Sequence, residues 1–329
     1  MLDTNVWSYL GDQGAAAEFD AFVRSRGATV VVPPSVLLEV LRLPKPDKRD
    51  RILRALLGGP RRRLTSEADL ESAEVVAEVR RLRPHWMRAV PDTGREAGWR
   101  TFWTKKVWRR AKEHPGAFLD VAPAVGTERV AEHLVEQQRQ QRAEVDRARA
   151  TLDDLSAMVM WQDPDGGGAG MPGWRPGDRV EPWRVHNREV YWQALAVVGP
   201  RSVLTHEDST LADWVGARVD LRAACADPAD FTAFWLYEAE ASRMPRNWLR
   251  WAADIAQADM RIGPGNPYDA QHSAYLPDCD IFLTADKNYV RVLDRLAAHA
   301  PVPIARARRV APAAHSGVVD AVRAALEEG

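Results

Sequence analysis

The chain has 329 residues, of which 46% are hydrophobic and 28% are charged, and its formal net charge is −1. This composition is typical of a globular protein, and it excludes a disordered chain and a basic protein that binds nucleic acid through its overall charge. No run of about 18 apolar residues occurs and no signal-peptide pattern opens the chain, so we expect a cytoplasmic protein without a membrane partner.

The first 84 residues alternate between strand-like and helix-like segments. Leu2 begins a short strand, and "ATVVVPP" is a β-branched run that ends at two prolines. The segments "SVLLEVLRL" and "SEADLESAEVVAEVRRLR" have helical spacing, with Ser35 and Ser66 as predicted N-caps. This alternation favours an α/β fold in which helices connect the strands of a parallel sheet.

Helical patterns dominate residues 85–252, and the alternation then returns. Near the C-terminus, "DIFLTAD" is a predicted strand, "KNYVRVLDRLAA" a helix and "VPIARARRV" an edge strand. We therefore predict one discontinuous α/β domain, formed by residues 1–84 and 253–329. A helical, Trp-rich insertion of residues 85–252 interrupts it.

Four acidic residues are expected near the carboxyl ends of the predicted strands, where open α/β sheets bind ligands. They are Asp3, Glu39, Asp269 and Asp286. Four carboxylates brought together repel one another, so such a cluster needs a cation. Oxygen ligands without cysteine favour Mg²⁺ or Mn²⁺. Taken singly, Asp3 and Asp269 are equally explained as helix caps, and Glu39 as a surface acid.

Three blocks of the sequence resemble the signature blocks of PIN-domain nucleases: "LDTNVW", "PPSVLLEV" and "YDAQHSAYLPDCDIFLTADKNY". The resemblance covers residues 1–84 and 253–315. It implies a Rossmann-like fold, with a parallel sheet flanked by helices, and a metal-dependent ribonuclease that leaves 5′-phosphate and 3′-hydroxyl ends. It also implies RNA as substrate, and an antitoxin or another protein as a partner. Oligomer formation stays open.

The resemblance also assigns roles to single residues. Its acidic quartet corresponds to Asp3, Glu39, Asp269 and Asp286, and Asp280 corresponds to a frequent extra acid of the metal site. Asn5 and Thr284 match residues that orient the carboxylates or the phosphate. His272 follows Asp269 by three residues and therefore shares its predicted helix face. We expect His272 to be a hydrogen-bonding neighbour rather than a ligand.

A basic stretch between residues 84 and 115 carries interleaved tryptophans. Cations that hold phosphates and rings that stack on bases are typical of single-strand binding. The residues predicted to contact RNA are Lys105, Lys106, Arg109, Arg110 and Trp103. A Trp-anchored helical layer with a solvated basic face explains the stretch equally well. The alternatives to a ribonuclease are a DNA-directed or flap-directed nuclease of the same chemistry, and a metal-free scaffold that acts through its insertion.

Overall fold

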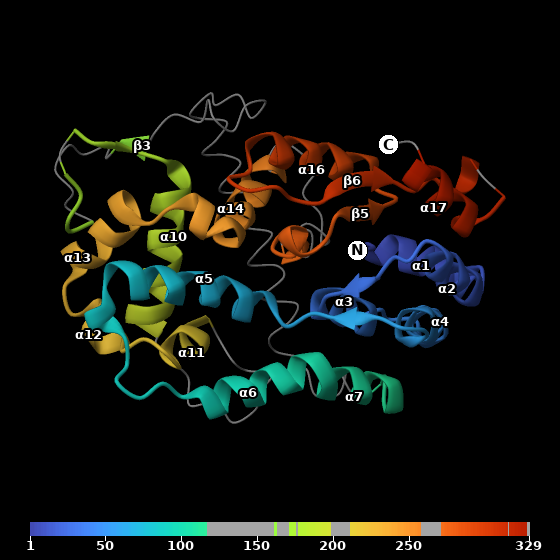
Figure 1. Ribbon diagram of the computed structural model, residues 1–329, viewed down its shortest axis with the longest axis horizontal. Coiled ribbons are helices and arrows are strands. Elements are labelled where there is room, and N and C mark those ends of the chain that lie inside the picture. The colour runs from blue at the N-terminus through green and yellow to red at the C-terminus, as the bar shows by residue number, and fades with distance from the viewer. Residues whose placement is uncertain are drawn as a thin grey trace.

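The structure is a computed structural model, and it describes seven stretches of the chain. These are residues 1–116, 161–162, 171–175, 177–198, 211–257, 271–314 and 316–327. Helices make up most of the described chain (Figure 1). Asp269 lies outside the described residues, and so does most of the segment between residues 117 and 170.

The α-helices fall into two groups along the chain. The first group is α1 Thr4–Asp12, α2 Ala16–Ser25, α3 Pro34–Leu41, α4 Pro46–Leu57, α5 Glu67–Leu82, α6 Thr93–Thr101 and α7 Val107–Glu113. The second group is α10 Pro182–Trp192, α11 Leu211–Gly216, α12 Leu221–Cys225, α13 Pro228–Ala233, α14 Pro245–Gln257, α16 Lys287–His299 and α17 Val318–Glu327.

Shorter helical turns connect these helices. The 3₁₀ turns are η1 Pro84–Trp86, η6 Ala241–Arg243, η7 Leu276–Asp278 and η8 Pro312–Ala314. Three π-helical segments are η2 Phe102–Lys106, η3 Gln193–Val198 and η5 Phe234–Glu238.

The predicted parallel sheet flanked by helices is wrong, because the described strands form only separate two-stranded sheets in a mostly helical chain. Strand β1 (Val31–Val32) pairs in parallel with β2 (Arg62–Arg63), and β5 (Ile281–Thr284) pairs in parallel with β6 (Arg306–Arg309). Strands β3 (Trp161–Gln162) and β4 (Arg179–Val180) form an antiparallel pair.

The strands are short for identifiable reasons. β1 ends at Val32 because the next residue, Pro33, has no backbone N–H to donate, and α3 begins directly after it at Pro34. The predicted first strand is reduced to one isolated bridge between Leu2 and Leu283, because α1 begins at Thr4. Of the two predicted N-caps, Ser66 does accept the N–H of Asp69. Ser35 does not cap α3, which begins at Pro34 without a side-chain cap.

The first three residues lie between two hydrophobic cores. Leu2 belongs to a core built mainly by α1, α2, α3, α4 and α17, whereas Met1 belongs to one built mainly by α14, α16 and β5. Backbone hydrogen bonds hold this segment against β5, from Leu283 N–H to the Met1 carbonyl (2.9 Å) and from Asp3 N–H to the Leu283 carbonyl (2.8 Å). Asp3 is thereby fixed at the end of β5 where Thr284 lies.

A third core joins α5, α10, α11 and η5. Helix α14 spans the predicted domain boundary at residues 252 and 253 and contacts α5, α10 and α16. The division into an α/β domain and an inserted layer stays a prediction.

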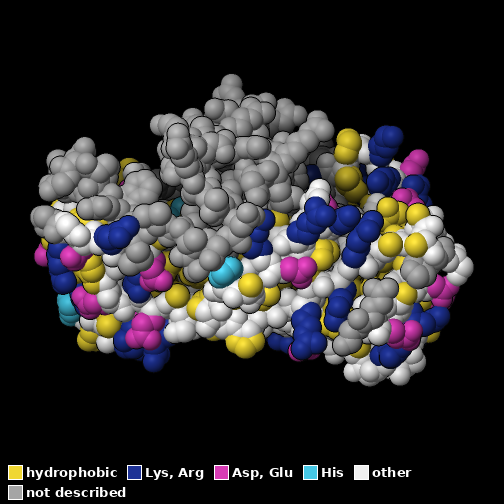
Figure 2. Space-filling model, turned by 90° about the horizontal axis from the view of Figure 1, so that it is seen from above, with side chains coloured by type: hydrophobic (Ala, Val, Ile, Leu, Met, Phe, Trp, Pro, Cys, Tyr) yellow, Lys and Arg dark blue, Asp and Glu magenta, His cyan; other side chains and the backbone are white. Residues whose placement is uncertain are grey.

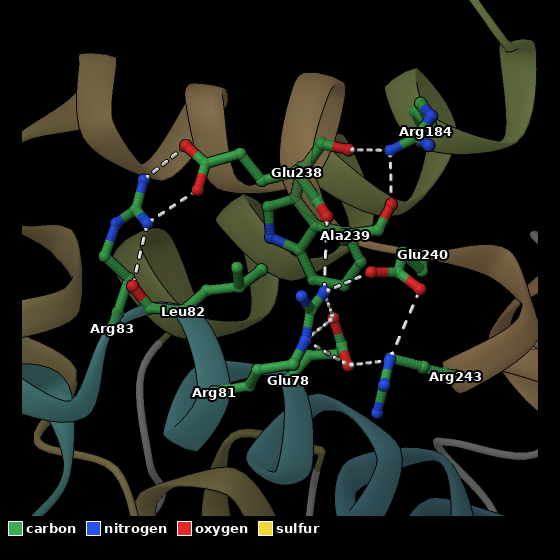
Figure 3. Close-up of polar contacts among 10 residues, drawn as sticks. Glu78, Arg81, Leu82, Arg83, Arg184, Glu238, Ala239, Glu240 and Arg243 are labelled. Atoms are coloured by element: carbon green, nitrogen blue, oxygen red, sulfur yellow. Dashed lines mark hydrogen bonds and ion pairs between the residues drawn. The ribbon is translucent and has the colours of Figure 1, made fainter.

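Helix α5 directs a row of glutamates toward the helices that pack on it. Figure 3 shows the end of this row, where Glu78 pairs with Arg81 and lies within 3.8 Å of Arg243. Next to it, Arg83 donates to both oxygens of Glu238 (2.8 and 2.9 Å). Because Glu78 is only 2% exposed, the arginines supply the charge that its burial requires. These pairs tie α5 to η5 and η6.

Glu71, in the middle of the row, makes the stability of the fold depend on pH. Burial raises the pKa of Glu71 to about 7, against the attraction of Arg250 and with added repulsion from Glu67 and Glu74. The folded chain therefore holds this proton more tightly than the unfolded chain. The stability that this proton binding contributes is complete below the unfolded pKa of 4.5 and is lost as the pH rises through about 7.

We expect Glu71→Gln to remove this dependence, because glutamine stays neutral. The free energy of unfolding of the wild type, minus that of the variant, should fall by about 3 kcal/mol between pH 4.5 and pH 8. Urea denaturation at several pH values measures this difference. A difference that stays constant, or that grows with pH, contradicts the assignment.

Candidate metal centre

Asp3 is a buried carboxylate held by three short hydrogen bonds. Its side chain is the N-cap of α1, where Oδ1 accepts the N–H of Thr4 (2.7 Å). Its Oδ2 accepts the Asn5 amide (2.6 Å) and the Thr284 hydroxyl (2.6 Å). Asn5 and Thr284 thus hold the Asp3 carboxylate in place. The cap and the ligand interpretations are compatible, because a carboxylate oxygen retains a further lone pair.

Asn5 and Thr284 are themselves fixed by the turn that follows β5. The Asn5 side-chain oxygen accepts the N–H of Ala285 (2.9 Å), and its amide also donates to the Thr284 hydroxyl (3.1 Å). The same hydroxyl oxygen accepts the N–H of Asp286 (3.0 Å). These bonds join the start of α1 to the end of β5, and they leave Asp3 little freedom to move.

Glu39 and His272 lie beside Asp3. One carboxylate oxygen from each acid and one imidazole nitrogen lie within 4.8 Å of one another. The Thr4 hydroxyl donates to Glu39 Oε2 (2.5 Å) and holds that carboxylate toward the cluster. Glu39 comes from α3, and His272 from the segment just before η7. Three parts of the chain therefore supply the cluster.

Electrostatics make this cluster costly without a cation. Burial raises the pKa of Asp3, and the nearby charge of Asp286 raises it further. Burial also raises the pKa of Glu39, with Asp3 adding to the shift and His272 opposing it. Burial lowers the pKa of His272, which favours the neutral imidazole that binds metals. Buried Asp3, partly buried Glu39 and a neutral histidine form a preorganised ligand set.

Asp286 lies at the solvent-exposed side of this cluster. It is the N-cap of α16, where its Oδ1 accepts the N–H groups of Asn288 (2.7 Å) and Tyr289 (3.2 Å). Its backbone N–H donates to the same Thr284 hydroxyl that donates to Asp3 (3.0 and 2.6 Å), so Asp286 begins α16 beside the residue that holds Asp3. Asp286 can therefore support the cluster from the exposed side.

Asp280 lies elsewhere. It precedes β5, whereas Thr284 and Asp286 mark the other end of that strand, and its carbonyl accepts the N–H of Arg306. A strand of four residues spans about 13 Å. Of the acids predicted for the metal site, the structure thus gathers Asp3 and Glu39, places Asp286 after the end of β5 that lies beside Asp3, and places Asp280 at the opposite end of that strand.

A divalent ion fits the cluster by the chemistry of its donors. Ligands bound at about 2.1 Å to one ion lie about 3 to 4 Å apart, so small side-chain shifts close a 4.8 Å cluster around it. Both nitrogens of His272 are buried and have no hydrogen-bond partner among the described residues. A bound ion would satisfy one of them. The residues present therefore fit a divalent metal held by Asp3, Glu39 and His272.

The predicted RNA contacts lie on η2 and α7. Lys105, Lys106 and Arg109 are exposed, and Arg110 and Trp103 are partly buried. Helix α7 packs on α4, the helix that also contacts α1 and α3 (Figure 1). The basic residues thus form a solvated face, and whether that face contacts RNA stays a prediction.

Three tryptophans of this stretch, Trp86, Trp99 and Trp108, are core residues. Trp99 packs on Trp214 with ring centroids 4.8 Å apart, and Trp86 packs on Phe231 and Phe234. Trp108 is 1% exposed beneath the guanidinium of Arg63. The three tryptophans are buried because they pack against different elements.

A second basic surface lies closer to the cluster. Lys287 and Arg291 are exposed one turn apart on α16, and exposed Arg309 of β6 is paired in register with Thr284. We call these three residues the α16 basic face. Figure 2 shows Lys and Arg side chains gathered over the part of the molecule where α16 and β6 lie in Figure 1.

Two features of the site were not predicted from the sequence. Thr4 lies inside the "LDTNVW" block, yet nothing local indicates that its hydroxyl binds Glu39, which is 35 positions away. Arg309 was treated only as part of an edge strand, and its position beside Thr284 depends on the β5–β6 register. Both depend on tertiary structure.

Comparisons of the chain with protein-family models, with curated proteins and with solved structures found no match. Among the described residues, no helix combines the length and the apolar character that crossing a bilayer requires.

Proposed function

We propose that the chain is a metal-dependent nuclease that hydrolyses phosphodiester bonds of RNA. One observation carries the proposal: buried Asp3 and partly buried Glu39 each place a carboxylate oxygen within 4.8 Å of a buried histidine whose nitrogens have no partner among the described residues. The resemblance of three sequence blocks to PIN-domain nucleases supports the same chemistry. The proposal does not depend on the large parallel sheet that this resemblance implied.

The residues around the cluster have distinct tasks in this proposal. Asp3 and Glu39 would hold Mg²⁺ or Mn²⁺, with His272 beside them and Asp286 as support from the exposed side. Such an ion lowers the pKa of a bound water and neutralises phosphate charge. Thr284 and Asn5 keep Asp3 in place, and Thr4 does the same for Glu39. This preorganisation avoids the cost of gathering like charges during catalysis.

The charge of the neighbouring surface favours a polyanion. Lys287, Arg291 and Arg309 are exposed, and no ion pair with an acidic residue is seen for them in the part of the chain that the structure describes. Exposed cations beside a metal site attract the phosphates of a nucleic acid. A cytoplasmic location belongs to the proposal as well, and it agrees with the free thiols of Cys225 and Cys279.

A cleavage assay tests the proposed function. We expect the full chain to cut a 5′-labelled single-stranded RNA in the presence of Mn²⁺ and to lose this activity in EDTA. The matching DNA strand and a DNA flap are assayed in parallel. Cleavage of either DNA substrate in place of the RNA identifies a nuclease directed at DNA. If the RNA stays intact both with Mn²⁺ and with Mg²⁺, at enzyme concentrations that saturate the substrate, the proposal is contradicted.

A further inference from the structure

His272 carries a cost that its hydrogen bonds do not explain. The residue is 1% exposed, and neither Nδ1 nor Nε2 has a partner among the described residues. A buried polar group without a partner costs about 1 to 3 kcal/mol. A neutral imidazole contains one N–H donor and one bare acceptor, and the acceptor is the atom that a metal ion binds.

The neighbours of His272 identify the kind of ion. One nitrogen lies within 4.8 Å of a carboxylate oxygen of Asp3 and of one of Glu39. Mg²⁺ prefers oxygen ligands and retains most of its waters, so it gains little from an imidazole. First-row transition ions bind imidazole nitrogen together with carboxylates.

We propose that His272 is a direct metal ligand and that it makes the site select Mn²⁺, or another first-row transition ion, over Mg²⁺. This inference rests on the proposed metal-dependent function and goes beyond it, because four carboxylates alone would not discriminate in this way. The sequence suggested only a neighbouring role for His272. Its burial and its position in the ligand set are what indicate coordination.

Metal binding by the full chain without substrate tests this inference. In isothermal titration, we expect the wild type to bind Mn²⁺ at least about tenfold more tightly than Mg²⁺. His272→Gln should weaken Mn²⁺ binding by more than about tenfold and leave Mg²⁺ binding nearly unchanged. Asp12→Asn is the matched control, since Asp12 is an exposed acid at the end of α1 that pairs with Arg51.

A spectroscopic measurement on the wild type makes the result independent of the variant's folding. Electron spin echo spectra of bound Mn²⁺ should show coupling to one imidazole nitrogen. Mn²⁺ that binds without nitrogen coupling, or Mg²⁺ that binds as tightly as Mn²⁺, overturns the role of His272 and leaves the nuclease proposal standing. Nitrogen-coupled Mn²⁺ in a protein that cleaves no RNA supports the ligand role and contradicts the nuclease.

Discussion

Replacing Asp3 by asparagine should lower the rate of metal-dependent RNA cleavage by more than about 100-fold. Even residues that only orient a ligand typically contribute about 10- to 100-fold to metal affinity or activity, and Asp3 is proposed as a ligand itself. Asparagine has the same shape and still offers an oxygen to the N–H of Thr4, but it lacks the charge that binds a cation.

The same substitution should leave the metal-free protein folded. In the absence of a cation, the buried charge of Asp3 opposes folding, as the raised pKa of this carboxyl indicates. The asparagine amide faces the Asn5 and Thr284 donors that Oδ2 accepts, and this cost opposes the gain from losing the buried charge. We therefore expect the thermal midpoint of metal-free Asp3→Asn to lie near that of the wild type. Added Mn²⁺ should raise the midpoint of the wild type only.

Two comparisons complete this prediction. Asp12→Asn should cut RNA at the wild-type rate, because Asp12 is exposed and contacts Arg51 rather than the cluster. Cleavage by Asp3→Asn at a rate within a factor of a few of the wild type, with the same dependence on Mn²⁺, rules out Asp3 as a ligand.

The largest effect on stability is expected at Glu74 of α5. Its carboxylate accepts the N–H groups of Arg246 (3.0 Å) and Asn247 (3.3 Å). These N–H groups lie in the first turn of α14, where a helix offers them no carbonyl of its own. It also accepts the guanidinium of Arg246 (2.8 Å) and the amide of Asn247 (3.0 Å). Glu74 thus caps a helix to which it does not belong, and it couples α5 to α14.

We expect Glu74→Ala to lower the free energy of unfolding by about 2 to 4 kcal/mol, because it removes the acceptor of the helix end and of buried Asn247, and leaves Arg246 with Asp278 as its remaining partner. Glu240→Ala is the matched control. The Glu240 side chain is 48% exposed and pairs with Arg81 and Arg243, so its loss should cost less than about 1 kcal/mol. Equal effects of the two substitutions in urea denaturation contradict this assignment.

Local patterns predicted several elements but not the way they assemble. The run "ATVVVPP" contains β1, "DIFLTAD" contains β5, and the cap at Ser66 begins α5. The sheet was wrong because pairing joins segments that are distant in sequence. Leu2 reaches Leu283 through one bridge only, and nothing before Thr4 shows that the helix begins so early.

The candidate site was predicted in part for the same reason. Asp3 and Glu39 lie together, and the end of β5 that adjoins Asp3 is the one followed by Asp286, whereas Asp280 precedes the opposite end. Spacing placed His272 on a helix face, whereas its position among the acids depends on how its segment packs against α1 and α3. Residue types suggested a chemistry, whereas tertiary packing decides which of the candidate residues lie together.

The most direct test of the metal centre is an anomalous scattering map from crystals of the full chain soaked in Mn²⁺. We predict a peak between the carboxylates of Asp3 and Glu39 and the imidazole of His272. A map without a peak there, from crystals that hold Mn²⁺ elsewhere, contradicts the metal centre and with it the proposed nuclease.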